Sequence, residues 1–190
     1  MIMKGRYFMN EVLKTIADRY SCRDFSATQL TKEQIENLVT ASLASPSALN
    51  LQPWHIIVVT DKSLIDEMDA TAMETGKSNN EPWYDRIVER GGKMFYNAPC
   101  MIFIMSDGSN YATLDCGIVS QNIALAAHSM GLGSVICGMA RIPLSGAKGE
   151  EYKKRLKFPE GYEFGMSVCV GYANSGKPPH EPDMSKVTYV

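Results

Sequence analysis

The chain has 190 residues, which is the size of one domain or at most two small ones. Its 19 Lys and Arg residues against 21 Asp and Glu residues give a net charge of −2, which argues against an electrostatic nucleic-acid-binding protein. Hydrophobic residues make up 45% of the chain and charged residues 21%, and these globular values exclude a disordered protein.

Helices and strands are predicted to alternate, because apolar residues recur at helical spacing in some segments and form short runs in others. The expected helices lie at about 10–19, from Thr31 onward, over a short stretch after Asp61, at about 112–130 and around 147–157, and the expected strands at 54–60, 100–106, 134–137 and 164–170. Thr31-Lys32-Glu33-Gln34 has the form of a capping box. Residues 72–97 have the least pattern, and the Pro-rich tail from Gly171 is expected to be extended. The alternation predicts a single mixed α/β layer structure.

One long segment carries no charge. The 25 residues from Cys116 to Ala140 contain no Asp, Glu, Lys or Arg, which is long enough to span a bilayer. Polar residues such as Gln121 and Asn122 interrupt the apolar surface, however, and Gly131 fits the position just after a helix end. A charge-free helix in a soluble protein is more often buried on all sides. We therefore expect a buried helix and no membrane segment.

The five cysteines form no C-x-x-C pair, so neither a zinc ribbon nor a thioredoxin-type site is expected, and no metal site is predicted. Several of them lie in apolar runs, where a free thiol behaves as a small hydrophobic group. Residues 1–6 include basic side chains but no apolar run follows them, so no signal peptide is expected. These features together favour a reducing, cytoplasmic location.

The segment Arg19-Tyr20-Ser21-Cys22-Arg23-Asp24-Phe25 follows the first predicted helix. Two guanidinium groups beside a hydroxyl can grip a phosphate, because Arg offers forked donors and Ser adds a third. The alternative is a solvated helix end whose arginines favour the negative pole of the helix dipole. The residues alone leave both interpretations open.

The loop Pro46-Ser47-Ala48-Leu49-Asn50-Leu51-Gln52-Pro53-Trp54 is dense in turn-forming residues. Ser47, Asn50 and Gln52 can each donate and accept hydrogen bonds, which suits the edge of a heteroaromatic ring. The simpler alternative is a loop whose side chains satisfy its own backbone.

The segment Gly131-Leu132-Gly133-Ser134-Val135-Ile136-Cys137-Gly138 superficially resembles a dinucleotide-binding fingerprint. Its third glycine is misplaced, and it follows a helix and opens a strand, which is the reverse of the Rossmann order. The glycines here can instead let backbone N–H groups approach a ligand closely. His55, His128 and His180 are scattered, and neither H-E-x-x-H nor G-x-S-x-G occurs, so no hydrolase set is predicted.

Taken together and in this order, these segments resemble the FMN-dependent nitroreductase family. Arg19–Phe25 matches the family's R-x-S-x-R-x-F opening, and Pro46–Trp54 matches its P-S-x-x-N-x-Q-P-W loop. The charge-free helix, the segment 131–138 and the closing Val170-Gly171-Tyr172 also fall where the family has them. The likeness covers nearly the whole chain and is weakest at 72–97.

The resemblance implies an α+β fold of three layers, with a mixed central sheet flanked by helices. Residues 1–190 would form a single nitroreductase-like, FMN-binding domain. The resemblance also implies an intertwined homodimer with two FMN sites at the subunit interface, so each active site would need both copies of the chain.

Within such a site, Arg19 and Ser21 would hold the FMN phosphate and Arg23 would reach the pyrimidine edge of the flavin. A basic residue of the tail usually completes the phosphate site in this family. Lys186 is the first choice for that role, and Lys177 is the alternative.

The ring-edge residues Ser47, Asn50 and Gln52 would come from the neighbouring subunit, and backbone around Cys137 would face N5 of the flavin. The family often has an acidic residue where Cys137 stands, a change that a backbone contact would survive. The full set implied to bind the cofactor is Arg19, Tyr20, Ser21, Arg23, Pro46, Ser47, Ala48, Asn50, Gln52, Ile136, Cys137, Gly138 and Lys186.

The implied activity is that of an FMN-dependent oxidoreductase with a ping-pong mechanism. NADH or NADPH would reduce the flavin and leave, and a nitroaromatic, quinone or similar small acceptor would take its place. No side chain is expected to be catalytic, because the cofactor carries the hydride chemistry. The alternatives are an FMN-binding or carrier protein with little turnover and, more distantly, a thiol hydrolase built on Cys137 or Cys22. The aromatic residues Trp83, Tyr84, Phe95 and Tyr96 would either wall the pocket or belong to the core.

Overall fold

The computed structural model describes residues 10–179 and 181–190. Its helices are α1 (Glu11–Asp18), α2 (Lys32–Leu43), α3 (Lys62–Ser78), α4 (Tyr84–Glu89), α5 (Ala112–Ser129), α6 (Arg141–Ser145) and α7 (Gly149–Arg155), its strands are β1 (Trp54–Val59), β2 (Cys100–Ser106), β3 (Gly133–Ile136) and β4 (Glu163–Gly171), and its short 3-10 turns are η1 (Ala48–Asn50), η2 (Gly138–Ala140) and η3 (Met184–Lys186). The N-terminal residues 1–9 and His180, about which the sequence raised expectations, lie outside the described residues.

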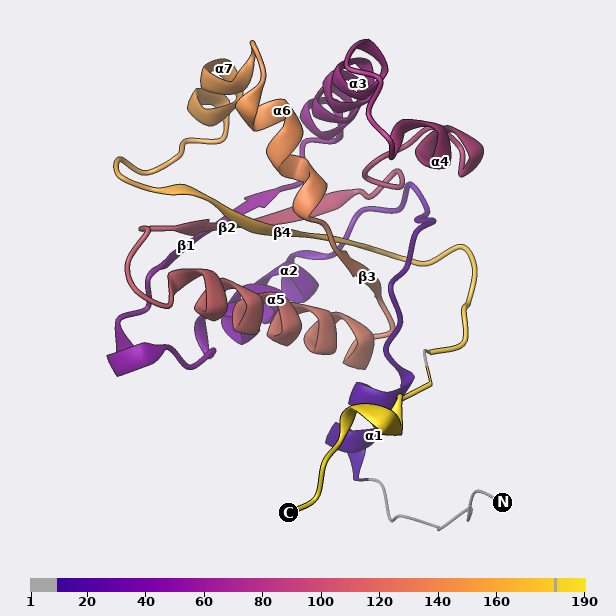
Figure 1. Cartoon of the computed structure of the whole chain (residues 1–190), viewed down its shortest axis with the longest axis vertical. Helices are drawn as coiled ribbons and strands as arrows, with labels where there is room; N and C mark the ends of the chain where they lie inside the picture. The colour runs from indigo at the N-terminus through magenta and orange to yellow at the C-terminus, as the bar shows by residue number, and fades with distance from the viewer. Residues whose placement is uncertain (1–9, 180) are drawn as a thin grey trace.

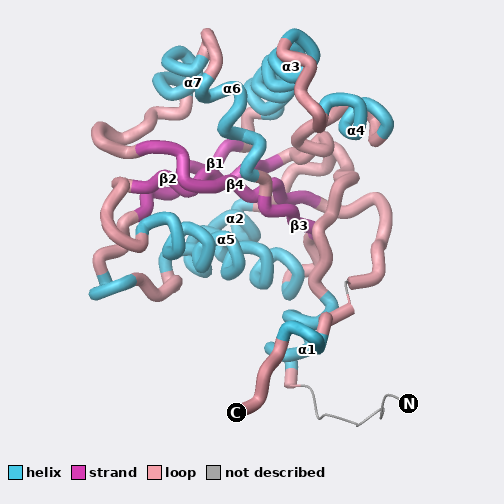
Figure 2. The backbone as a smooth tube through the Cα atoms, viewed as in Figure 1, coloured by secondary structure: helices cyan, strands magenta, loops and turns pink. Residues whose placement is uncertain are grey.

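The elements form three layers, as expected. Figure 1 shows the sheet in the middle, with α2 and α5 on one side and α3, α6 and α7 on the other. Figure 2 shows the same division by element type, with helices on both faces of the strands. Helix α1 lies outside these layers, against the C-terminal end of α5.

The four strands are ordered β1-β2-β4-β3, and each neighbouring pair runs antiparallel. Strands β2 and β3 therefore point the same way, with β4 between them. The expectation of a mixed sheet is wrong for these four strands, and the parallel contact in the described part of the chain is an isolated bridge between Ser21 and Ser134. Apolar runs identify strands but carry no information on direction, because both arrangements place side chains alternately on the two faces.

Strand β2 divides the interior into two hydrophobic cores, because all of its residues are buried. Met101, Phe103 and Met105 belong to the core beneath α3, α6 and α7, whereas Ile102 and Ile104 belong to the core against α2 and α5. A strand covered on both faces reads as a continuous apolar run rather than an alternating one. The sequence Cys-Met-Ile-Phe-Ile-Met-Ser therefore occupies the centre of the molecule.

The predicted helix starts are confirmed. The side chain of Asn10 accepts a hydrogen bond from the Leu13 N–H and caps α1. At α2, Thr31 Oγ1 accepts from the Gln34 N–H at 3.2 Å, and Gln34 Oε1 accepts from the Thr31 N–H at 2.9 Å. This reciprocal pair is the capping box expected from the sequence.

The segment after Asp61 differs from expectation, because α3 is long and continues to Ser78. Asp61 caps it, its carboxylate accepting hydrogen bonds from the Ser63 and Leu64 N–H groups. The weakly patterned segment 72–97 thus contains the end of α3 and all of α4, and α6 is a further helix that the sequence did not predict. These segments pack against the core through few residues, so their helical periodicity is short and weak.

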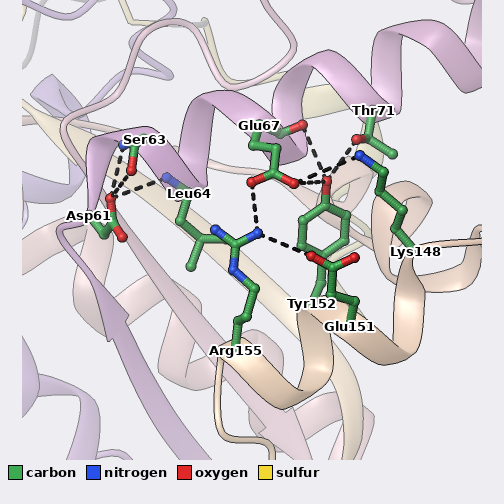
Figure 3. Close-up of polar contacts among 9 residues, drawn as sticks. All are labelled: Asp61, Ser63, Leu64, Glu67, Thr71, Lys148, Glu151, Tyr152 and Arg155. Atoms are coloured by element: carbon green, nitrogen blue, oxygen red, sulfur yellow. Dashed lines mark hydrogen bonds and ion pairs between the residues drawn. The ribbon is translucent and has the colours of Figure 1, made fainter.

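A polar network joins α3 to α7 on the outer side of the sheet (Figure 3). The hydroxyl of the fully buried Tyr152 lies 2.7 Å from Thr71 Oγ1, and Arg155 Nη1 donates to Glu67 Oε2 at 2.7 Å. The hydrogen bond from Arg155 holds the pKa of Glu67 below its usual value. The network joins these two helices over one face of the sheet.

Helix α5 contains the first half of the charge-free stretch, and β3 follows it, but one chain does not bury the helix on all sides. Val119, Ile123 and Ala127 face the core, whereas Leu114 and Gly117 are exposed. No helix among the described residues is long and apolar enough to cross a membrane. The apolar outer surface of α5 is therefore left without a partner in the single chain.

Candidate functional site

The Arg19–Phe25 segment is tied by backbone contacts to the edge of the sheet. Ser21 forms a bridge with Ser134 at β3, and the Cys22 N–H donates to the Ser134 carbonyl at 2.9 Å. Further along, Phe25 forms a second bridge with Ala173, just after β4. The segment is therefore a fixed part of the fold, which is unlike a solvated helix end.

Gly133 permits this close approach. A Cβ atom at position 133 would lie 2.9 Å from the Cys22 side chain, which is closer than real Cβ contacts allow. The Cys22 thiol is buried and donates to the Asp24 carbonyl at 3.3 Å, and burial raises the pKa of that thiol. Gly133 thus allows the two backbone segments to pack closely at Cys22. Cys22 itself is a buried structural residue of the Arg19–Phe25 segment.

Two adjoining cavities open beside this segment and share Tyr20, Ser21, Arg23 and Lys177. The larger, of about 500 Å³, is lined by Tyr20, Ser21, Arg23, Asp24, Arg90, Ser175 and Lys177. The smaller, of about 360 Å³, is lined by Arg19, Tyr20, Ser21, Arg23, Lys177, Pro178 and Pro179. The structure therefore brings the predicted phosphate-binding residues Arg19, Ser21 and Arg23 to one place.

Positive charge dominates the walls of these cavities. Among the described residues, no ion pair within 4.0 Å involves Arg19, Arg23, Arg90 or Lys177. The carboxylate of Asp24 instead accepts from Asn174 Nδ2 at 2.9 Å. Unpaired cations that converge on a hollow repel one another, and an anionic ligand removes this cost. The donor set, forked guanidiniums with a hydroxyl and an ammonium, fits a phosphate group.

Of the two tail lysines, Lys177 lines both cavities, whereas Lys186 lines neither in the single chain. Lys186 ends the 3-10 turn η3, whose start is capped by Asp183. The tail is therefore not extended throughout, because the Asp183 side chain satisfies a turn after the last proline. The assignment of Lys186 to the phosphate remains a prediction, and Lys177 has the better position in one chain.

The ring-edge loop lies at the opposite end of the molecule from the Arg19–Phe25 segment, as the purple turn η1 and the indigo segment after α1 show in Figure 1. Leu49, Asn50 and Gln52 all have left-handed backbone conformations, with φ of 53°, 55° and 50°. Such conformations cost free energy for residues other than glycine and cluster at functional sites. Leu49 is also 92% exposed, so nothing in the single chain compensates for this strain through burial.

Part of the loop's polar capacity is used internally. Ser47 Oγ accepts from the Gln52 N–H at 2.9 Å, and Gln52 Nε2 donates to Asn50 Oδ1 at 3.3 Å. The side-chain Nδ2 of Asn50 and the side-chain Oε1 of Gln52 have no hydrogen-bond partner within the described residues, and both residues are exposed. The Ser47 side chain therefore does satisfy the backbone of its own loop, as the simpler alternative predicted. Asn50 and Gln52 still have hydrogen-bonding groups available for a ligand.

Beside the loop, Pro46, Ser47 and Ala48 line a cavity of about 290 Å³ together with residues at the start of α5. Asp115 is buried there, and its Oδ2 has no hydrogen-bond partner within the described residues. A buried carboxylate oxygen without a partner is costly. This region, like the outer face of α5, is incomplete in one chain.

The segment Ile136–Gly138 leaves the sheet at the end of β3, where Cys137 is buried and its neighbours Ile136 and Gly138 are exposed. The hydrogen bond between the Cys137 and Cys169 thiols lowers the pKa of Cys137 and raises that of Cys169. Backbone N–H groups of Met139 and Ala140 add to the lowering at Cys137. The Cys137 carbonyl accepts from Ser167 Oγ at 2.6 Å, which fixes the backbone here.

The aromatic residues of 72–97 belong mainly to the core. Phe95 is fully buried, and Trp83 and Tyr96 pack at the core's edge. Burial raises the pKa of Tyr96, and the nearby Arg23 guanidinium works against that rise. Tyr96 thus lies against a predicted site residue, while the core interpretation holds for Phe95.

Comparisons with known proteins agree with this geometry. The model of the nitroreductase family matches residues 16–172. A protein of Archaeoglobus fulgidus, named as a candidate NADH dehydrogenase/NAD(P)H nitroreductase, is 32% identical over 185 residues, covering 92% of each chain. A similarly named protein of Methanothermobacter thermautotrophicus is 31% identical over 140 residues, and the match spans 64% of its length.

Among solved structures, a nitroreductase with bound FMN from Desulfitobacterium hafniense superposes with a TM-score of 0.92 at 48% identity, covering 96% of this chain and 99% of that one. The chain therefore belongs to the nitroreductase family. The matched residues 16–172 include both the Arg19–Phe25 segment and the ring-edge loop, so these two motifs lie within the family's region.

Sequence reasoning missed three residues that line the larger cavity, namely Asp24 as a wall residue, Arg90 and Ser175. Asp24 lies inside the recognised motif, but Arg90 comes from the weakly patterned segment and Ser175 from the tail. No periodicity or motif marks Arg90, because its place in the site depends on how α4 packs.

Proposed function

We propose that two copies of this chain hold two FMN molecules and act as an NAD(P)H-dependent oxidoreductase on small acceptors. The observation that carries the proposal is the group of cations that line the paired cavities with Ser21 and have no ion-pair partner in the described part of the chain. The FMN-bound relative with 48% identity supports the choice of cofactor. Nitroaromatic and quinone acceptors are the class expected for the family.

The phosphate of the cofactor would be held by Arg19, Ser21 and one tail lysine. Arg19 donates through a planar fork, the Ser21 hydroxyl adds a short donor, and the ammonium supplies a point charge. Lys177 is favoured over Lys186 because it already lines both cavities. The bridge between Ser21 and Ser134 fixes the backbone that carries the hydroxyl, so little backbone ordering is needed on binding.

Arg23 would lie along the pyrimidine edge of the flavin. Its Nη1 donates to the Ser21 carbonyl at 3.3 Å, which directs the guanidinium back over the motif. A fixed positive charge at that edge favours the anionic, reduced form of the cofactor. Arg23 would therefore tune the cofactor rather than transfer a proton.

Bound FMN would supply the hydride chemistry between the nicotinamide and the acceptor. The chain's own contribution would be to bind, orient and exclude water. One cleft would serve both substrates in turn, which predicts ping-pong kinetics. The buried state of all five free cysteines fits the proposed cytoplasmic location, and residues 1–190 are proposed to act as one domain.

Two copies are needed because the ring-edge loop and the Arg19–Phe25 segment are far apart in one chain. Pro46, Ser47, Ala48, Asn50 and Gln52 would reach the flavin of the partner, and the backbone at 136–138 would reach the flavin held by its own chain. The strain at Leu49 and Asn50 supports a binding role for this loop.

Anaerobic spectroscopy tests the proposed activity. The purified protein should be yellow, should bleach with NADH or NADPH and should regain its colour on addition of menadione. A yellow protein that does not bleach would favour an FMN carrier, and a colourless protein that takes up no FMN would defeat both flavin proposals.

Arg23→Ala should weaken FMN binding and slow NAD(P)H oxidation at least tenfold, because one lost charge-assisted contact is worth roughly 1.5–3 kcal/mol. Flavin content and steady-state rates measure the effect. Arg86→Ala, an exposed arginine of α4 that lines neither cavity, is the control. Equal flavin content and rate in the two variants would contradict the role of Arg23.

A further inference from the structure

The larger cavity contains one cation that the proposed flavin site does not need. Arg90 lines it together with Ser175 and Lys177 but does not line the smaller cavity, whereas Arg19 lines only the smaller one. The FMN phosphate uses Arg19, Ser21 and a lysine in the proposal above, and Arg23 serves the ring. Arg90 is thus an additional positive charge at the exposed rim.

Arg90 is held at this rim by the packing of α4. A Cβ at Gly76 would lie 2.1 Å from the ring of Trp83, so the absence of a side chain there lets Trp83 seat against α3. Ile87 of α4 is buried in the same region. The Arg90 N–H donates to the Ile87 carbonyl at 3.1 Å and closes the helix. The backbone that carries Arg90 is therefore anchored, while its side chain extends into the cavity.

The charge at the cavities exceeds what one phosphate neutralises. Four cations, Arg19, Arg23, Arg90 and Lys177, line the two cavities with one carboxylate, Asp24. A phosphate monoester carries about two negative charges at neutral pH. With Asp24 also counted, about one positive charge remains, and it favours a further anionic group near Arg90. The rim position suits a group on the entering substrate rather than on a resident cofactor.

We propose that Arg90, with the Ser175 hydroxyl beside it, binds the 2′-phosphate of NADPH and makes this chain prefer NADPH over NADH. This inference rests on the proposed function and adds the choice of reductant to it. The 2′-phosphate is the chemical difference between the two dinucleotides, and an arginine is the usual group that accommodates it. A hydroxyl beside the guanidinium supplies a further donor to the same phosphate.

The test compares Arg90→Gln with Arg86→Gln in the flavin-loaded protein. The ratio of kcat/KM for NADPH to that for NADH should exceed about ten in the unaltered protein and fall at least tenfold in Arg90→Gln, which removes a charge-assisted contact. Arg90→Lys should give an intermediate ratio, because the charge remains but the fork is lost. Arg86→Gln should keep the original ratio.

Binding of fragments provides a readout independent of turnover. Adenosine 2′,5′-bisphosphate should bind at least tenfold more tightly than 5′-AMP by calorimetry, and Arg90→Gln should remove most of that difference. The FMN dissociation constant of Arg90→Gln is measured in parallel.

Three results would overturn the inference. The first is an unaltered protein that uses NADH and NADPH equally well or prefers NADH. The second is an Arg90→Gln variant that keeps the original ratio. The third is a variant that loses FMN affinity with its ratio unchanged, which would make Arg90 a flavin-phosphate ligand. In each case a yellow, bleaching protein leaves the proposed function intact, whereas a protein that takes up no FMN defeats the proposed function itself.

Discussion

Asp69 shows how one buried side chain supports the site from a distance. It lies on α3, is only 3% exposed, and its Oδ2 accepts from the Phe95 N–H at 2.7 Å. This bond anchors the turn in which Tyr96 has a left-handed backbone, and Tyr96 in turn contacts Arg23. Burial raises the pKa of Asp69, and the hydrogen bond from Phe95 only partly opposes that rise.

Asp69→Asn should match or exceed the unaltered protein in free energy of unfolding at pH 7, because the amide oxygen still accepts from Phe95 without a buried charge. Asp69→Ala should lose about 1–3 kcal/mol by leaving that N–H unpaired. The folded-state pKa lies above the unfolded value, so ionisation costs stability at neutral pH and the cost disappears below the unfolded pKa of 3.8. The unaltered protein should therefore gain stability relative to Asp69→Asn as pH falls.

Urea unfolding of the three proteins between pH 7 and pH 4 measures both effects. Comparison at each pH cancels the contributions of other carboxylates. Equal destabilisation by Asn and Ala at pH 7 would contradict this account.

At the scale of elements, the position of α4 depends on the absence of a side chain at Gly76. Gly76 on α3 faces the ring of Trp83 at the start of α4, and the Glu81 N–H donates to the Gly76 carbonyl at 2.9 Å. The two helices are therefore fitted to each other at this position. Because α4 carries Arg90, the same contact controls one wall of the larger cavity.

Gly76→Ala should destabilise the protein by about 1–3 kcal/mol, because the new methyl group overlaps the Trp83 ring and α4 must move. Thermal unfolding measures the loss, and a change in tryptophan fluorescence should report the displaced ring. Glu74→Ala, at an exposed position of the same helix, is the control. If the free energies of unfolding of Gly76→Ala and Glu74→Ala differ by less than about 0.5 kcal/mol, α4 can shift without cost and the contact between Gly76 and Trp83 does not fix its position.

At the scale of the whole molecule, one chain leaves a large apolar surface uncovered. On α1, Val12, Leu13 and Ile16 are 63%, 49% and 47% exposed, and no residue of that helix is buried. Leu114 on α5 is also exposed. An amphipathic helix with an exposed apolar face implies a partner surface. A second copy of the chain is the proposed partner, because the ring-edge loop also needs one.

Leu13→Asp combined with Ile16→Asp should convert the proposed dimer into a monomer, because two charges would have to be buried in an apolar interface. Sedimentation velocity measures the assembly, and flavin content should fall with it because each site needs both copies. Lys154→Asp, an exposed change on α7 across the sheet, is the control. A double variant that stays dimeric and retains FMN would place the interface elsewhere.

Features that depend on local chemistry could be predicted from the amino-acid sequence alone. The capping box at Thr31 and the strand 100–106 were predicted with their observed bounds, since both follow from neighbouring residues. The family and its two main motifs were also recognisable, because contiguous residues carry them. Local patterns contain this information in full.

Contacts between residues that are distant in sequence became visible only in the folded chain. Arg23, Arg90 and Lys177 line one cavity although they are far apart in sequence, and strand directions likewise depend on long-range pairing. No local pattern records such contacts, because they arise when α4 and the tail pack against the sheet edge. The sequence therefore identified the flavin-type motif, whereas packing placed Arg90 beside it at the rim.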